Sequence, residues 1–370
     1  MARSLRLSTE PDAYDLQLDA LQPEASTGQG YLVHARTDEA AVAAATGMPV
    51  IYTVSSRVQP ANRRKHLESA FVEHRRHSAA GARVDVNLYS GKNRKTADAD
   101  IDADFLNFQA RLGASSITTD SGYVGQGNEV ALKRLFEDGA RKLGPYGDRG
   151  VLDVIVHSDF VSKYPEVLAD LIRSYGIPVS LKVEHATDPF ASRDAVRGLV
   201  LIGSTGVPTE LLRTDIAAGG ALAVGYRSVS IGTGSGLRHV YPSQGGGPSG
   251  NTVTFHVIHP QGLAFRTPER LSDAISLDPD NHHWVCVCDI CYGRSIQRLA
   301  LNEVDASRHS IEIIGAKLHQ LLAQPAETRR AQWADWCGHA LAVNLEIKDL
   351  VTNWPNPSNL RAWQDVLTKG

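Results

Sequence analysis

The stretch Val151–Val183, VLDVIVHSDFVSKYPEVLADLIRSYGIPVSLKV, decides the fold class of this chain. Its first part, Val151–His157, is almost continuously apolar and predicts a buried strand. Pro165–Tyr175 follows with apolar residues at helical spacing, and Pro178–Val183 is a second apolar run. Runs rich in Val, Ile and Leu without clean alternation are typical of strands covered on both faces of a parallel sheet. The stretch therefore predicts a β–α–β unit.

The same rhythm of short apolar runs and longer helical stretches continues over most of the chain. A further helix is predicted at Glu129–Leu143. The other predicted strands are Val50–Ser55, Val84–Ser90, Ser116–Asp120, Leu199–Gly203, Val224–Ile231 and Val253–Ile258. About eight such repeats favour an α/β fold of the (β/α)8, TIM-like barrel type, with a doubly wound sheet as the alternative.

The chain has 370 residues, enough to bury a sizeable core. We expect an N-terminal extension at residues 1–47 that packs on the barrel, and a catalytic barrel at residues 48–283. Residues 284–370 turn helical and are expected to form a C-terminal zinc-binding helical subdomain.

The net charge of −3 gives no global attraction to nucleic acid, so any such binding must use local patches. Arg57–Arg76 is one basic segment, although a solvated helix face explains it as well. The opening residues lack the apolar region of a secretion signal, and no apolar run is long enough to cross a membrane. We therefore expect a cytoplasmic protein without a membrane partner.

Three of the four cysteines, Cys286, Cys288 and Cys291, lie in WVCVCDICYG at residues 284–293. Thiolates this close together cannot all pair as disulfides, and a tetrahedral Zn²⁺ site with one histidine satisfies them best. His282 and His283 are nearby candidates for the fourth ligand. The alternative is three small buried residues on a strand and turn. Clustered cysteines also point to a reducing compartment.

Acidic residues just past predicted strands are the candidate catalytic groups, because barrel active sites form at that face. Asp120 precedes Ser121 and Gly122, and the glycine allows a close backbone approach to a ligand. Asp159 follows the Val151–His157 strand. Each of these has an ordinary turn or helix-cap interpretation beside the functional one.

Four other features are weaker. Asp278 and Asp280 lie in Asp-Pro-Asp-Asn, which is turn chemistry unless its context says otherwise. Lys182 ends a predicted strand and is expected to line the same mouth. Gly232 opens the glycine-rich stretch Gly232–Gly250, predicted to be a long loop. Cys337 lies on a helical stretch where core packing explains it best.

Together these pieces resemble the tRNA-guanine transglycosylase family. Residues 118–123, TTDSGY, are similar to that family's Thr-Asp-Ser-Gly-Gly-Phe motif, and CVCDIC matches its Cys-x-Cys-x2-Cys. Asn302-Glu303 and His309-Ser310-Ile311 resemble its Asn-Glu and His-Asn-Leu segment. Residues 254–275, TFHVIHP to TPERLSDAI, are similar to its seventh strand and following helix.

The resemblance implies a mechanism in which one aspartate displaces guanine from a nucleoside and forms a covalent glycosyl-enzyme. A second aspartate then manages protons as a 7-deazaguanine takes over the sugar. By motif Asp120 would handle protons and Asp159 would read the base edge. Asp278 is the first choice for the nucleophile and Asp280 the second, and His309 would be the fourth zinc ligand. The substrate pocket would also include Ser121, Gly122, Lys182 and Gly232.

The chain departs from the family in ways that bear on its substrate. Tyr123 follows the Asp-Ser-Gly motif, the usual sequence around the nucleophile is absent, and 17 residues separate Cys291 from His309. The trimming resembles the divergent branch that inserts 7-deazaguanines into DNA, often encoded by phages or genomic islands. DNA is therefore the favoured partner and tRNA the alternative.

Two further alternatives belong to different classes. The first is a non-catalytic partner subunit that keeps the zinc site and lacks the acids, and an oligomer fits this interpretation. The second is an unrelated zinc-stabilised barrel hydrolase, which a full Cys3His ligand set disfavours because no open position remains for water.

Overall fold

The computed structural model describes residues 29–243 and 255–369. Its main sheet is parallel throughout, with the strand order β3-β2-β1-β9-β8-β7-β6-β4 and a short strand β5 that also pairs with β6. The strands are β1 Gly30–Arg36, β2 Val50–Thr53, β3 Ala82–Asp85, β4 Ile117–Thr118, β5 Tyr123–Val124, β6 Gly150–His157, β7 Val179–Glu184, β8 Thr209–Thr214 and β9 Ser228–Gly232.

The first and last strands of this sheet along the chain, β1 and β9, lie side by side. Val33 of β1 pairs with Val50 of β2 on one side and with Ile231 of β9 on the other. The two strands at the ends of the strand order, β3 and β4, also approach each other. The Ser115 amide, just before β4, donates to the Ala82 carbonyl of β3 (2.8 Å). In a doubly wound sheet, the strands that come first and last along the chain are not neighbours. The sheet is therefore curled and TIM-like.

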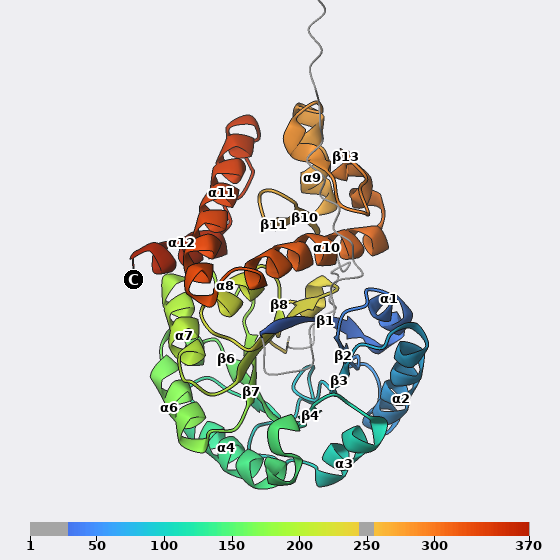
Figure 1. Ribbon diagram of the computed structural model, residues 1–370, viewed down its shortest axis with the longest axis vertical. Helices are drawn as coiled ribbons and strands as arrows, with labels where there is room; N and C mark the ends of the chain where they lie inside the picture. The colour runs from blue at the N-terminus through green and yellow to red at the C-terminus, as the bar shows by residue number, and fades with distance from the viewer. Residues whose placement is uncertain (1–28, 244–254, 370) are drawn as a thin grey trace, which may run out of the picture.

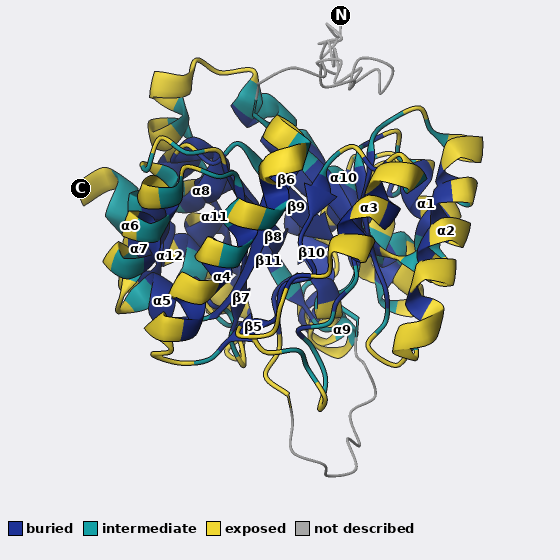
Figure 2. Ribbon diagram, turned by 90° about the horizontal axis from the view of Figure 1, so that it is seen from below, coloured by how far each residue is buried: buried dark blue, intermediate teal, exposed yellow. Residues whose placement is uncertain are grey.

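Helices surround the sheet and bury it, with their outer faces exposed (Figures 1 and 2). They are α1 Ala40–Ala44, α2 Pro60–His77, α3 Ala103–Leu112, α4 Glu129–Leu143, α5 Asp159–Ser162, α6 Pro165–Tyr175, α7 Arg193–Gly203, α8 Ala217–Ala223 and α10 Glu303–Leu322. Side-chain caps start several of them: Asp102 begins α3, Asn128 begins α4 and Ser192 begins α7. Each side chain accepts a hydrogen bond from a first-turn amide that would otherwise lack a partner.

A compact insertion separates β9 from α10. It contains the antiparallel pair β10 Val257–His259 and β11 Ala264–Arg266, helix α9 Pro268–Leu277, and the small hairpin β12 Val285–Cys286 with β13 Arg294–Ser295. Its apolar side chains form a second core together with residues 343–354, in which the indoles of Trp284 and Trp354 meet edge to face. Figure 1 shows it above the barrel, at the right.

After α10 the chain continues into α11 Arg329–Leu350 and α12 Ser358–Lys369, which pack back on the barrel helices. Gly219 and Gly220 of α8 make this possible. A Cβ on them would lie 2.2 Å from the Trp333 ring and 2.4 Å from the Trp363 ring. The interior side chains of α12 and most of those of α10 and α11 belong to the main barrel core, whereas Ala306, Val343 and Ile347 belong to the core of the insertion.

Several predicted boundaries need correction. Strand β1 lies inside residues 1–47, which were predicted to be an extension, so the sheet begins before residue 48. Strand β8 was missed, and Leu199–Gly203 is the last part of helix α7. Of the predicted strand Val253–Ile258, the first two residues lie outside the described part, and Val257 and Ile258 belong to the antiparallel pair. Helix α10 belongs to the outer layer of the barrel, so residues 284–370 are not a separate helical subdomain.

Candidate functional site

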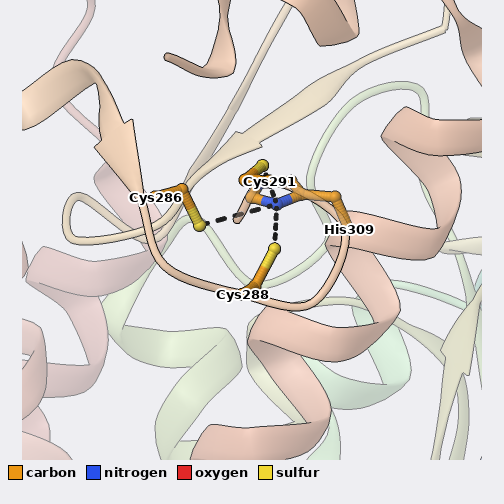
Figure 3. Close-up of side chains that lie close together, drawn as sticks. All are labelled: Cys286, Cys288, Cys291 and His309. Carbon is orange, nitrogen blue, oxygen red and sulfur yellow. Dashed lines mark hydrogen bonds between the residues drawn. The ribbon is translucent and has the colours of Figure 1, made fainter. Parts of the chain in front are cut away.

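Four side chains of the insertion and of α10 converge on one point (Figure 3). The Nδ1 atom of His309 lies 3.8 Å from the sulfur of Cys286, 3.3 Å from that of Cys288 and 3.5 Å from that of Cys291. All four potential ligand atoms lie within 4.8 Å of one another. Tetrahedral zinc with ordinary bond lengths places each sulfur about 3.5 Å from the imidazole nitrogen. The cluster can therefore hold a metal ion of this size.

The turn that carries the cysteines is built from local hydrogen bonds. The amides of Cys291 and Tyr292 both donate to the Cys288 carbonyl (3.0 and 2.8 Å), and the Gly293 amide donates to the Cys286 carbonyl (2.9 Å). Tyr292 and Gly293 both have positive φ, at 53° and 72°, so the chain reverses sharply here. The reversal brings Cys291 back beside Cys286.

The histidine is oriented by a second contact. The free ring nitrogen of His309, Nε2, lies 3.0 Å from the Ile258 carbonyl, which fixes Nδ1 as the metal-facing atom. His283 instead contacts Gln261 (2.7 Å) and Glu346 (2.9 Å). Of the histidines considered as the fourth ligand, the structure brings His309 to the cysteines. Cys337 is buried in the barrel core, which confirms its packing role.

Asp120 lies two residues past β4, and both its carboxylate oxygens have partners. Lys95 Nζ donates to Oδ2 (2.7 Å), and the Asp102 amide donates to Oδ1 (2.9 Å). The side chain is 6% exposed. Asp120 therefore lies past the carboxyl end of a strand, as the motif predicts, and Lys95 holds its carboxylate.

Ser121 and Gly122 serve the chain itself in this structure. The Ser121 hydroxyl hydrogen-bonds that of Thr119 (2.7 Å). A Cβ on Gly122 would lie 2.2 Å from the Thr96 carbonyl oxygen, because the loop after β3 pairs with Tyr123 at this point. The expected close approach at Gly122 is thus to this loop rather than to a ligand.

Asp159 starts the short helix α5, two residues past β6. Its Oδ2 accepts hydrogen bonds from Gln126 (2.7 Å) and Lys163 (3.1 Å). Burial opposes ionisation, but these donors outweigh it and hold the pKa of Asp159 below its usual value. A base edge that binds here has to displace the glutamine or the lysine.

Asp278 and Asp280 do not follow a strand of the barrel. Asp278 ends helix α9 and accepts a hydrogen bond from the Asn281 amide group (2.9 Å), while its carbonyl accepts one from the Trp284 indole (2.7 Å). Asp280 is exposed in the next turn. Among residues 29–243 and 255–369, the preceding strand β10 pairs with β11 alone and is no part of the barrel sheet. The prediction that the two aspartates follow the last barrel strand is therefore wrong.

Lys182 points into the interior of the curled sheet instead of lining its mouth. Its Nζ lies 2.6 Å from Asp153 Oδ2 and 3.4 Å from Asp85 Oδ2, with the lysine side chain 1% exposed. Burial alone would lower the pKa of Lys182, but the charges of the two aspartates outweigh it and hold that pKa above its usual value. Lys182 is therefore a charged structural group.

Gly232 ends β9 and makes room for the chain that folds back over it. A Cβ there would lie 2.4 Å from the Leu237 carbonyl oxygen. Residues 233–243 of the predicted loop are described, and residues 244–250 lie outside the described part.

Two acids at strand ends were missed by the sequence reasoning. Asp215 follows β8 directly, and Asp188 lies in the loop after β7. Burial and the charge of Asp215 raise the pKa of Asp188 to about 7. The sequence LLRTD contains the end of β8 and the acid that follows it. The strand is hard to predict because the buried charged residues Glu210 and Arg213 interrupt its apolar run.

Within the described residues, no helix is both long and apolar enough to cross a membrane. A scan against protein-family models and a search of curated proteins found no match.

Solved structures give only distant similarities. The thiamine phosphate pyrophosphorylase from Pyrococcus furiosus is 14% identical with a TM-score of 0.32, over 55% of this chain and 85% of that chain. The carboxyl transferase domain from Rhizobium etli pyruvate carboxylase is 12% identical with a TM-score of 0.37, over 93% of this chain and 61% of that chain. An uncharacterized B. cereus protein is 14% identical with a TM-score of 0.29, over 55% of this chain and 60% of that chain. The fold assignment rests on the strand order described above.

Proposed function

We propose that this chain is a transglycosylase that exchanges guanine for a 7-deazaguanine base in nucleic acid, with DNA favoured over tRNA. The supporting observation is a combination of two features in one order along the chain. Asp120 follows a strand of a TIM-like sheet. The three cysteines of a Cys3His cluster lie between the last barrel strand, β9, and helix α10, and α10 supplies the histidine. The family that the sequence resembles combines the same two features.

The cluster fits zinc best, since three thiolates and one imidazole form its preferred tetrahedral donor set. Cys286, Cys288, Cys291 and His309 would hold the ion, and four protein ligands leave no position for water or substrate. Bound there, zinc supplies structural cross-linking of the insertion to α10 rather than Lewis-acid chemistry.

Asp120 is the group that would move protons during exchange. Lys95 holds one of its oxygens and a backbone amide holds the other, so the carboxylate is fixed in orientation before a substrate arrives. In the proposed exchange, Asp120 would act first as a base. Duplex DNA would have to present its guanine flipped out of the stack, at a cost of a few kcal/mol.

A second candidate function is a non-catalytic partner subunit of such an enzyme. It is favoured by the position of Asp278 and Asp280, which do not follow a barrel strand and so do not meet the requirement for the nucleophile. Both candidates share the metal cluster and differ in whether Asp120 is needed for turnover.

Incorporation of labelled guanine and of a labelled 7-deazaguanine into duplex DNA and bulk tRNA, side by side, tests the proposal. We expect label in DNA from the zinc-loaded full chain, and loss of incorporation in Asp120→Asn. Label in tRNA alone would assign the tRNA-modifying alternative. No label in either, with nucleic-acid binding retained, would replace catalysis by the partner-subunit function.

A further inference from the structure

The segment at residues 233–241, which follows β9, crosses the carboxyl ends of several strands. At its start, the Thr233 amide donates to the His34 carbonyl of β1 (3.0 Å). Near its end, the Val240 amide donates to the Val183 carbonyl of β7 (3.1 Å). Strands β1, β9, β8 and β7 are consecutive in the strand order, so the segment runs across the ends of all of them.

Val240 also reaches the other side of the curled sheet. Its side chain packs with Tyr89, Tyr123 and Ile155 in a small apolar cluster, and all four residues are buried. Tyr89 follows β3, Tyr123 begins β5 and Ile155 lies in β6. Because β3 is at one end of the strand order and β6 and β7 are near the other, Val240 closes the mouth of the barrel.

Tyr89 separates Val240 from charged groups inside the barrel. Its hydroxyl donates to Asp85 Oδ2 (2.6 Å) and accepts from Arg213 Nη1 (3.1 Å). Lys182 Nζ lies 4.8 Å from the centroid of its ring. All three charged residues are buried. Val240 and Tyr89 therefore seal a charged interior from water.

The segment is held to β7 by far fewer contacts than the barrel strands are held to one another. Strands β6 and β7 share six pairs of facing residues, from Leu152 with Val179 to His157 with Glu184. Within the described residues, the segment pairs with β7 through a single bridge, between Glu184 and Val240. Elements with few hydrogen bonds and little buried apolar surface open at a lower free energy than the core. Local release of the segment should therefore precede any opening of the barrel.

Arg213 of β8 connects the segment to the charged interior. Its Nη2 donates to the Gly236 carbonyl (2.7 Å), while its Nη1 contacts the Tyr89 hydroxyl. Its φ is 55°, a left-handed conformation that is uncommon for residues other than glycine. Such conformations persist where surrounding contacts hold them. Arg213 is therefore the latch between the segment and the groups beneath it.

Two glycines give the segment a freedom that its position here does not require. Among the described residues, no heavy atom lies within 4 Å of a Cβ built on Gly236, and the nearest to one on Gly234 is 3.7 Å away. Neither glycine has φ in the left-handed region. Glycine gains more conformational entropy than alanine when a segment is released. Both glycines therefore favour the released state.

We propose that residues 233–241 form a gate over the mouth of the barrel, closed in this structure. The gate opens when Val240 leaves the end of β7 while the barrel strands stay paired. Opening exposes Tyr89 and the charged groups beneath it to water, so the gate controls access to the barrel interior. The gate is independent of which reaction the strand ends support.

Thiol labelling under native conditions tests the gate. Val240→Cys and Val156→Cys make the same substitution at two buried positions, one in the gate and one in β6. Each zinc-loaded full chain is treated with a thiol reagent, and label at the new cysteine is located by mass spectrometry. We expect Val240→Cys to react at least about a hundredfold faster, because the gate opens locally and β6 opens only with the barrel.

Gly236→Ala, added to Val240→Cys, should slow the labelling about two- to fivefold, since alanine fits the closed gate and restricts the open one. Gly144→Ala is the matched control, because it also has open space at its Cβ position but lies outside the gate. It should leave the labelling rate of Val240→Cys unchanged.

Hydrogen exchange in the natural protein gives a second measurement that does not depend on any variant folding. The His185 amide donates to the Val240 carbonyl (2.9 Å), so both the Val240 and the His185 amides lose their partners when the gate opens. We expect these two amides to exchange faster than the amides of β6. Protection equal to that of β6, or equal labelling of Val240→Cys and Val156→Cys, would overturn the gate.

Discussion

At the scale of single residues, the carboxyl ends of the strands hold two kinds of acid. Asp120, Asp159 and Glu184 are each paired with a cation. Asp188 and Asp215 instead act on each other, and burial with the charge of Asp215 raises the pKa of Asp188 to about 7. Like charges that are buried near each other share a proton because both cannot ionise cheaply. A negative charge on Asp188 is therefore unfavourable in the folded protein.

The pH dependence of stability should report on Asp188. Its folded pKa lies above its ordinary value of 3.8, so the folded state keeps a proton that the unfolded chain releases between about pH 4 and pH 7. Stability contributed by this group therefore falls as pH rises through that window and levels off above it. Asp188→Asn should raise the melting temperature at pH 8 and change it little at pH 4. An equal change at both pH values would contradict the assignment.

Gly122 offers a prediction that does not involve ionisation. A Cβ added there meets the Thr96 carbonyl oxygen at 2.2 Å, and backbone cannot move aside as a flexible side chain can. Gly122→Ala should lower the free energy of unfolding by about 1–3 kcal/mol, measured by urea denaturation. Gly144→Ala is the control, because no heavy atom lies within 4 Å of its Cβ position and its φ is −44°. Equal stability of the two variants would show that the loop after β3 is not fixed by Gly122.

At the scale of elements, the Cys3His cluster joins three pieces of chain. Hairpin β12–β13 supplies Cys286, the turn supplies Cys288 and Cys291, and α10 supplies His309. Strand β10 holds the far side of the imidazole through the Ile258 carbonyl. The insertion shares a small core with residues 343–354, so a metal ion there would contribute much of its stability.

Removing one thiolate should show this coupling. Cys288→Ser is expected to lose most of its bound zinc, measured by atomic absorption, and to melt its insertion at a lower temperature than the barrel. Cys337→Ala should keep one metal equivalent per chain, because Cys337 lies in the core of α11 away from the cluster. A Cys288→Ser protein that keeps a full equivalent of zinc and its melting temperature would exclude the Cys3His assignment.

Elements with continuous apolar runs, such as β6 and β7, could be predicted from the sequence. The metal cluster could be predicted from the spacing of its cysteines. Strand β8 could not, because Glu210 lies inside the sheet between Arg83 and Arg227 and interrupts the pattern. The apolar run Leu199–Gly203 predicts a strand, but it is the end of helix α7, Arg193–Gly203. The complete helix has one buried face. The segment that folds back over Gly232 brings Val240 to the end of β7, and no local pattern reveals that reversal.

At the scale of the whole molecule, basic residues form a route toward Asp120. The Cβ position of Gly91 lies 3.6 Å from the Ser56 Cβ, which brings the loops that carry Arg57 and Lys92 together. Arg57 and Lys92 are exposed and form no ion pair within the described residues. Lys95, three residues past Lys92, contacts Asp120. A nucleic-acid backbone that follows this route would bring a flipped base to the strand ends.

Salt dependence of DNA binding tests this route. The double variant Arg57→Ala with Lys92→Ala should bind duplex DNA more weakly, and the slope of log K against log salt should fall by about 2, one for each lost phosphate contact. Arg173→Ala is the control, since Arg173 lies in the last turn of another helix, α6, and pairs there with Asp170. An unchanged slope in the double variant would place the nucleic acid elsewhere.

The central claim is Asp120-dependent base exchange, and release of labelled guanine from duplex DNA tests it most directly. DNA carrying labelled guanine is incubated with zinc-loaded protein and an excess of unlabelled 7-deazaguanine. The account predicts free labelled guanine from the natural protein and from Asp280→Asn, with release reduced at least about a hundredfold in Asp120→Asn. Release that is equal in Asp120→Asn, or absent from the natural protein on both DNA and tRNA, would contradict it.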